Sequence, residues 1–125
     1  MNKNKPNHIL LVEDDAAYRT IVLSMLRRAG FTSSFAVNGD HAIKKLEQEK
    51  FDMIIIDYLL PGPNGLEVVR WARKHEINIP AIIITNYPSD ELNLTDDLIG
   101  NTNILPKMAF TPTDILSIIQ QMMDV

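Results

Sequence analysis

The sequence predicts an α/β fold in which a doubly wound, parallel five-stranded sheet is covered by helices on both faces. Apolar runs rich in Ile and Val recur at residues 8–12, 52–56 and 81–85 without alternating polar positions. Such runs are typical of parallel strands buried on both faces. Between them, apolar residues recur every three or four positions, as on one face of a helix. Strand–helix alternation with right-handed crossovers favours an open sheet.

The remaining elements follow from weaker patterns. Residues 31–37 are predicted as a weaker strand that contains β-branched and aromatic residues, and residues 103–106 as a short last strand. The first three helices are indicated by the apolar stripes Tyr18, Ile21, Val22, Met25 and Leu26, then Ala42, Ile43 and Leu46, then Val68, Val69 and Ala72. Residues 89–100 are polar and only weakly helical. Five βα units are too few for an eight-stranded barrel and fit a flavodoxin-like sheet of strand order 2-1-3-4-5.

The last helix has the clearest start signal. Thr111 can cap it, Pro112 suits its first turn, and Asp114 is favourable at its positive end. Its apolar stripe consists of Ile115, Leu116, Ile118, Ile119 and Met122.

Length and composition limit the classes of protein that the chain can be. A chain of 125 residues that is 46% hydrophobic is the size of one domain, which we expect to span residues 1–125 with residues 1–7 as a polar N-terminal extension. Without cysteine it has neither disulfides nor thiolate ligands, and a reducing cytoplasm is the expected compartment. A net charge of -4 with scattered basic residues disfavours direct binding of nucleic acid, and no apolar run is long enough to enter a membrane.

Polar and charged residues stand at the carboxyl end of four predicted strands, where the chemistry of open α/β sheets is found. These residues are Glu13, Asp14 and Asp15 after the first strand, Asp57 after the third, Thr85 and Asn86 at the fourth, and Lys107 after the fifth. Each taken alone has a plain explanation as a turn, a helix cap, a strand residue or a surface lysine. Because the topology brings all of them to one edge, we expect a functional site there. The three histidines, His8, His41 and His75, are expected at surface positions outside it.

Carboxylates packed together repel one another unless a cation offsets their charge. Mg²⁺ prefers carboxylate, carbonyl and water oxygens and commonly bridges to phosphate. With a metal ion present, an ionised aspartate can attack phosphorus and form an aspartyl phosphate. Lys107 and Thr85 would then hold the phosphoryl oxygens during the in-line transfer.

Four sequence blocks, "VEDD", "IIIDYLLPGPNGLE", "IIIT" and "LPK", occur in an order and at separations that resemble the receiver domains of two-component response regulators. The resemblance runs from residue 8 through the last helix, and the chain is similar in size to the single-domain chemotaxis regulators. It implies a CheY-like fold and these roles: Asp57 as phosphoacceptor; Glu13, Asp14, Asp57 and the carbonyl of Leu59 as Mg²⁺ ligands; Thr85 as switch hydroxyl; and Lys107 as phosphate-binding lysine. Asp15 is additional and need not touch the metal.

The resemblance also implies the partners. Receiver domains catalyse their own phosphorylation and dephosphorylation and are not turnover enzymes on an external substrate. They take the phosphoryl group from a phosphohistidine on a sensor histidine kinase or a histidine phosphotransfer protein. Phosphorylation then switches a surface that binds a downstream protein.

Three positions depart from the family pattern. Ile104 stands where a switch aromatic is usual, so the usual relay is expected to be absent or altered. Met108 replaces a proline that follows a cis bond, and because a cis bond before a non-proline residue costs about 3 kcal/mol, a trans bond or a rearranged loop is expected. Asn86 replaces a small residue and is expected to change how water reaches the acyl phosphate.

Three other functions fit the sequence less well. A receiver-like protein-binding module that works without phosphorylation is favoured by Ile104, Met108 and Asn86, but the complete acidic, hydroxyl and lysine set argues against it. A phosphohydrolase of the aspartyl-phosphate type would need a second carboxylate where Leu59 stands, and a substrate cap. A flavodoxin-like carrier would need a phosphate-binding loop where the sequence "EDDAA" is found.

Overall fold

The computed structural model describes residues 7–86, 101–107 and 111–123. The strands are β1 (His8–Val12), β2 (Thr32–Ala36), β3 (Met53–Asp57), β4 (Ala81–Thr85) and β5 (Thr102–Pro106). The helices are α1 (Ala16–Arg28), α2 (Gly39–Gln48), α3 (Gly65–Lys74) and α4 (Pro112–Met123). The weakly helical stretch 89–100 and Met108 lie outside the described residues, so the expectations for them stay predictions.

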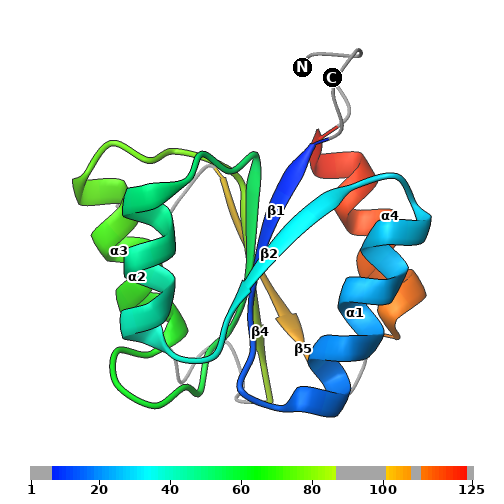
Figure 1. Ribbon diagram of the computed structural model, residues 1–125, viewed down its shortest axis with the longest axis horizontal. Coiled ribbons are helices and arrows are strands. Elements are labelled where there is room, and N and C mark those ends of the chain that lie inside the picture. The colour runs from blue at the N-terminus through cyan, green and yellow to red at the C-terminus, as the bar shows by residue number, and fades with distance from the viewer. Residues whose placement is uncertain (1–6, 87–100, 108–110, 124–125) are drawn as a thin grey trace.

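The five strands form one parallel sheet in the order β2-β1-β3-β4-β5, which confirms the predicted topology. Helices α2 and α3 lie together on one face, and α1 and α4 lie together on the other (Figure 1). The predicted bounds of β3 were one residue too early. Asp57 is the last residue of the strand and pairs with Ile84 of β4, because its backbone continues the ladder although its side chain is charged.

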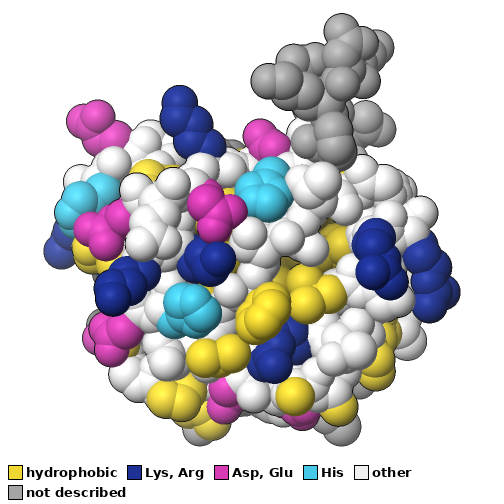
Figure 2. All heavy atoms as spheres, viewed as in Figure 1, with side chains coloured by type: hydrophobic (Ala, Val, Ile, Leu, Met, Phe, Trp, Pro, Cys, Tyr) yellow, Lys and Arg dark blue, Asp and Glu magenta, His cyan; other side chains and the backbone are white. Residues whose placement is uncertain are grey.

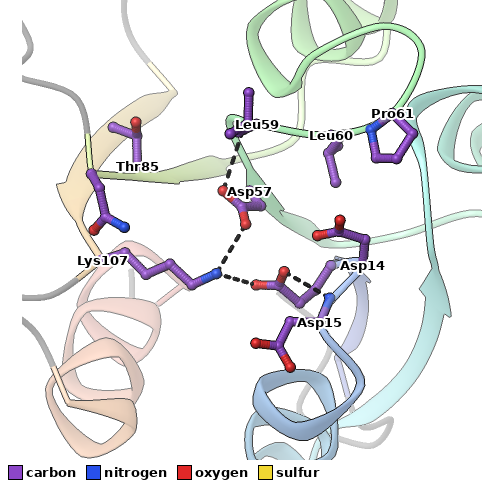
Figure 3. A pocket seen from close by; sticks show the side chains of 10 residues that line it. Asp14, Asp15, Asp57, Leu59, Leu60, Pro61, Thr85 and Lys107 are labelled. Atoms are coloured by element: carbon purple, nitrogen blue, oxygen red, sulfur yellow. Dashed lines mark hydrogen bonds and ion pairs between the residues drawn. The ribbon is translucent and has the colours of Figure 1, made fainter.

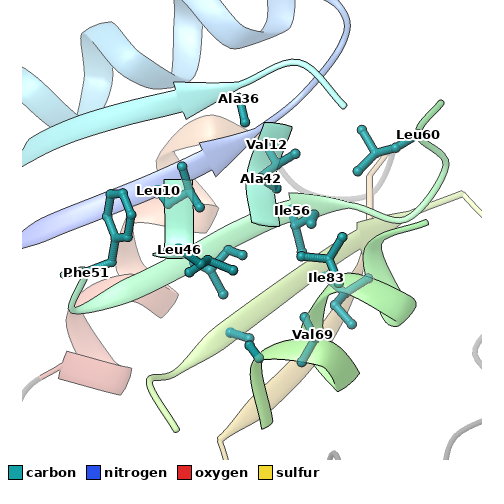
Figure 4. Close-up of a cluster of buried hydrophobic side chains, with 14 of the residues drawn as sticks. Leu10, Val12, Ala36, Ala42, Leu46, Phe51, Ile56, Leu60, Val69 and Ile83 are labelled. Carbon is teal, nitrogen blue, oxygen red and sulfur yellow. The ribbon is translucent and has the colours of Figure 1, made fainter. Parts of the chain in front are cut away.

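Two hydrophobic clusters, one on each face, make up the core. Successive residues of β1 enter different clusters: Leu10 and Val12 pack toward α2 and α3, whereas Ile9 and Leu11 pack toward α1 and α4. The first of these clusters is drawn in Figure 4. The central strands are therefore apolar at every position except His8, Asp57 and Thr85 at their ends, which explains the uninterrupted apolar runs in the sequence.

A tight loop between β3 and α3 fixes the backbone around Asp57. Asn64 caps α3 in a capping box with Glu67, in which each side chain accepts from the other residue's backbone N–H. The Gly65 N–H donates to the Tyr58 carbonyl at 2.8 Å. A Cβ atom on Gly65 would lie 2.5 Å from the Asp57 carbonyl oxygen, so only glycine fits here.

Arg73 joins the end of α3 to the start of β5. Its Nη1 donates to the carbonyls of Ile77 at 2.9 Å and Ile79 at 2.7 Å. Its Nη2 donates to the Asn101 carbonyl and to Thr102 Oγ1, both at 3.2 Å. Four acceptors from two segments of the chain thus hold one guanidinium, which suits its fixed fork of donors.

A polar cluster lies near the N-terminal end of β1, away from the carboxyl ends of the strands. Glu49 Oε1 contacts His8 Nε2 at 3.1 Å and accepts from Ser34 Oγ at 2.9 Å, while Oε2 accepts from Lys45 Nζ at 3.2 Å. The His8 ring also stacks on Phe51 at 4.9 Å. The bond with His8, supported by the other two, lowers the pKa of Glu49 to about 2.

The surface carries both charge signs. Figure 2 shows acidic and basic side chains interspersed over the face that carries β2, α1 and α2. Within residues 7–86, 101–107 and 111–123, no helix is both long enough and apolar enough to cross a bilayer.

Candidate functional site

Asp57 lies where β3 ends, with 11% of its side chain exposed. Its Oδ1 accepts a bond from the Leu59 N–H at 3.3 Å, and its Oδ2 accepts from Lys107 Nζ at 3.0 Å (Figure 3). The Tyr58 N–H donates to the Ile84 carbonyl at 2.8 Å, which ties the chain beyond Asp57 to β4. The carboxylate is therefore held at the mouth of a cleft and remains accessible to solvent.

Two further carboxylates follow β1. The Glu13 side chain is only 2% exposed, whereas Asp14 is exposed. The Glu13 carboxylate accepts hydrogen bonds from Lys107 Nζ at 2.9 Å and from the Asp15 N–H at 3.2 Å. Asp15 turns to the N-terminus of α1, where its carboxylate accepts from the N–H groups of Ala17 and Tyr18. Asp15 thus caps the N-terminus of α1, and the expectation that it need not contact a metal stays a prediction.

Three carboxylates from two strand ends lie close enough to share one cation. Ligand oxygens of Glu13, Asp14 and Asp57 all lie within 4.8 Å of one another. This set of hard oxygen donors fits Mg²⁺, which needs only a few protein ligands because it retains several waters. Leu59, whose carbonyl is the remaining predicted ligand, lines the same cleft.

Lys107 closes the cleft from β5. Its backbone N–H donates to the Thr85 carbonyl at 2.8 Å, which continues the pairing of β5 with β4. Burial alone would lower the pKa of the ammonium group, but the bonds to Glu13 and Asp57 outweigh burial and raise it. Lys107 is therefore a permanent positive charge between two carboxylates.

Burial has the opposite effect on Glu13. Removal from water raises the pKa of Glu13 from 4.5 to about 7, because the lowering effect of Lys107 is smaller than the cost of burying the charge, and Asp57 adds repulsion.

Thr85 and Asn86 lie on the β4 side of the cleft. Thr85 is the last residue of β4 and is 2% exposed, whereas Asn86 is exposed. The structure thus brings all the predicted strand-end residues to one cleft, lined by Glu13, Asp14, Asp15, Asp57, Leu59, Leu60, Pro61, Thr85, Asn86 and Lys107.

Other predicted residues lie outside the cleft lining. Ile104 sits within β5, half-buried, and packs against the cluster beneath α2 and α3. His8 is in the polar cluster near the start of β1, His41 Nδ1 accepts from the Val37 N–H at 3.3 Å, and His75 stacks on Trp71. All three histidines lie outside the cleft, as expected. His41 and His75 bond to residues four positions away, whereas His8 is half-buried and bonds to Thr32 and Glu49, which are distant in the sequence.

Two residues at the site were not recognised from the sequence. The Lys107 ammonium lies over the ring of Tyr18 at 4.6 Å, and Arg19 Nη1 donates to the Glu13 carbonyl at 2.9 Å. Both lie in the first turns of α1, directly after the acidic residues. Their position next to the acidic residues is the signal that the sequence offers, but Tyr18 also fits the apolar stripe of α1, which predicts a place in the core.

A family model decides which group of proteins this chain belongs to. The model that describes the response regulator receiver domain matches residues 9–120. The chain is a member of that family. It functions as a receiver domain of a two-component system, and the predicted CheY-like fold is confirmed.

Receiver domains of several proteins are similar to this chain. It is 29% identical over 116 residues to the transcriptional regulatory protein ResD of Bacillus subtilis. The aligned residues cover 93% of this chain and 48% of ResD. It therefore spans about half of that relative. It is also 29% identical to the receiver protein CpdR of Brucella abortus, over 92% of this chain and 95% of CpdR.

One solved structure is the receiver domain of the sensor histidine kinase PA1611 from Pseudomonas aeruginosa PAO1, with magnesium coordinated in the active site cleft. The two chains superpose with a TM-score of 0.81 at 27% identity, covering 96% of this receiver domain and 99% of the other.

Proposed function

We propose that this receiver domain accepts a phosphoryl group on Asp57 from a phosphohistidine of a sensor histidine kinase or a histidine phosphotransfer protein. The observation that carries the proposal is the position of Asp57, which lies at the mouth of the cleft among two other carboxylates and one ammonium group. In the transfer, a P–O bond forms to Asp57 while the P–N bond to the donor imidazole breaks. The domain promotes this step on itself and does not turn over an external substrate.

Glu13, Asp14, Asp57 and the Leu59 carbonyl are the proposed ligands of Mg²⁺. The clustered oxygens of the three acids support this assignment, as does the magnesium ion in the cleft of the PA1611 receiver domain. Bound Mg²⁺ neutralises charge on the carboxylates and on the incoming phosphoryl oxygens. Arg19 holds the backbone of Glu13 from α1, which keeps this ligand in place.

Lys107 and Thr85 are proposed to hold phosphoryl oxygens. The Lys107 ammonium group is already 3.0 Å from Asp57 and needs only a small shift to reach an oxygen on phosphorus. We infer that Thr85 and Ile104 transmit the change to a surface that binds a downstream protein, and that Asn86 controls access of water to the acyl phosphate. The cysteine-free composition supports a cytoplasmic setting for this exchange.

The test is phosphorylation by a small donor. The protein is incubated with Mg²⁺ and acetyl phosphate, and intact mass is measured. We expect the added mass of one phosphoryl group, removable by hydroxylamine as for an acyl phosphate. Asp57→Ala should abolish the gain, while Asp40→Ala, which removes an exposed carboxylate in α2, should leave it unchanged. Unmodified wild-type protein, or equal labelling of Asp57→Ala, would overturn the proposal.

A further inference from the structure

The ring of Tyr18 forms one wall of the site around the Lys107 ammonium group. Tyr18 lies in the first turn of α1, and its backbone N–H donates to the capping carboxylate of Asp15 at 3.3 Å. The Lys107 Nζ lies 4.6 Å from the ring centroid. A cation this close to the face of an aromatic ring is attracted by the ring's quadrupole.

The three contacts of the ammonium group differ in one respect. Two are with Glu13 and Asp57, at 2.9 and 3.0 Å, and these carboxylates are also proposed ligands of Mg²⁺. A divalent ion bound to them weakens their hold on the ammonium group, because it offsets the negative charge that attracts the ammonium group. The Tyr18 ring carries no metal-ligating atom in contact with the ammonium group, so its attraction for Lys107 does not depend on the metal.

We propose that Tyr18 is a positioning residue, whose ring keeps the Lys107 ammonium group beside Asp57 when Mg²⁺ and phosphoryl oxygens engage the carboxylates. The proposal rests on the proposed function, because it assigns Lys107 a role toward the phosphoryl group. Ile104 stands in β5 where the family pattern has an aromatic residue. The aromatic ring that contacts Lys107 is instead that of Tyr18 in α1.

The hydroxyl group of Tyr18 has no part in this role. Its oxygen is buried and has no hydrogen-bond partner among the described residues. Replacing Tyr18 by Phe removes only this unpaired polar group and retains the ring, so the variant should fold at least as well as the wild type. Tyr18→Met replaces the ring by a flexible apolar side chain that adapts to its surroundings. The two variants therefore separate the ring from the hydroxyl.

Two measurements test the proposal. The first is the rate at which an amine-acylating reagent modifies Lys107, followed by peptide mass with and without Mg²⁺. We expect Tyr18→Met to react about three- to tenfold faster than wild type in Mg²⁺, and Tyr18→Phe to match wild type. The second is the rate of phosphorylation by acetyl phosphate at saturating Mg²⁺. Tyr18→Met should be about three- to tenfold slower and Tyr18→Phe unchanged.

A double variant separates the positioning role from a purely structural role. If Tyr18 acts through Lys107, Tyr18→Met should cause no further loss of phosphorylation rate in a Lys107→Met background. If Tyr18 is purely structural, the loss should be the same in both backgrounds. Thermal unfolding checks that each variant folds, and Tyr18→Leu replaces Tyr18→Met if the latter does not.

Wild-type rates in Tyr18→Met for both measurements, or an equal loss in Tyr18→Phe, would overturn the proposal. If wild type takes no phosphate, the proposed function fails, and the acylation rates alone decide whether the ring holds Lys107.

Discussion

Lys107 and Asp57 stand 50 residues apart in the sequence, yet the ammonium nitrogen lies 3.0 Å from a carboxylate oxygen. The same nitrogen lies 2.9 Å from Glu13. One lysine thus offsets the charge of two carboxylates that are also proposed ligands of Mg²⁺. Lys107 and Mg²⁺ are therefore expected to compete for these carboxylates, although both are proposed to favour phosphoryl transfer.

Replacing Lys107 should separate its competition with Mg²⁺ from its support of phosphoryl transfer. We expect Lys107→Met to bind Mg²⁺ about tenfold more tightly, because the competing cation is gone, when binding is titrated near pH 8. Phosphorylation by acetyl phosphate should nevertheless be at least about a hundredfold slower, because a charge partner of the phosphoryl oxygens is lost. Lys44→Met, at an exposed position in α2, is the control for charge alone. Weaker Mg²⁺ binding in Lys107→Met would contradict the competition.

The pH dependence of Mg²⁺ binding should reveal Glu13. Because burial raises the pKa of Glu13 to about 7, its proton has to leave before the oxygens can bind a metal. Affinity should rise as pH increases from about 6 to about 8, by up to about tenfold, and then level off. Isothermal titration at several pH values measures this slope. Glu13→Gln should bind Mg²⁺ weakly, and its affinity should not depend on pH over this range. An equal slope in both proteins would show that another group titrates.

The same shift acts on the stability of the metal-free protein in the opposite sense. The folded pKa of Glu13 lies above its ordinary value of 4.5, so its contribution is present below pH 4.5 and is lost as the pH rises through about 7. Chemical denaturation without metal should accordingly find the stability difference between wild type and Glu13→Gln growing over this interval, in favour of the variant.

Glu49 should control stability in acid. Its folded pKa is lowered to about 2, so its contribution is present above the ordinary value of 4.5 and is lost as the pH falls toward about 2. Urea unfolding of Glu49→Gln should therefore show a smaller loss of stability between these values than wild type. Glu47→Gln, at an exposed position in the last turn of α2, just before Glu49, serves as the comparison. Parallel curves for wild type and Glu49→Gln would contradict the role of the bond with His8.

Gly65 should tolerate no side chain. A Cβ atom there would lie 2.5 Å from the Asp57 carbonyl oxygen, so Gly65→Ala should lower the free energy of unfolding by about 1–3 kcal/mol and displace the β3–α3 loop. Gly30→Ala is a matched control, because Gly30 has φ +95° but no atom within 4 Å of its would-be Cβ. Its cost should be limited to backbone strain. Thermal unfolding compares the two, and equal losses would rule out the steric cause.

Asn86 should affect how long the phosphoryl group persists. Its side chain is exposed and lines the cleft that contains Asp57. We expect the phosphate lifetime of Asn86→Ala to differ from that of wild type, because the amide and the smaller methyl group give water different access. The lifetime is followed by intact mass after removal of the donor, and identical lifetimes would reject the role of Asn86.

The topology and the composition of the cleft could be predicted because they follow from periodicity. Unbroken apolar runs specify strands covered on both faces, and parallel strands bring their carboxyl ends together, so Asp57 and Lys107 could be assigned to one edge. Which of Glu13 and Asp14 turns inward could not be predicted, since both follow β1 and both are acids. The contact between Tyr18 and Lys107 was also missed, because a ring in an apolar stripe fits the core equally well.

Arg73 has a consequence for how Lys107 reaches the cleft. Its guanidinium holds Asn101 and Thr102 to residues that precede β4, so the start of β5 is anchored to the end of α3 as well as to β4. Because Lys107 directly follows β5, the same four bonds help to place its ammonium group beside Asp57.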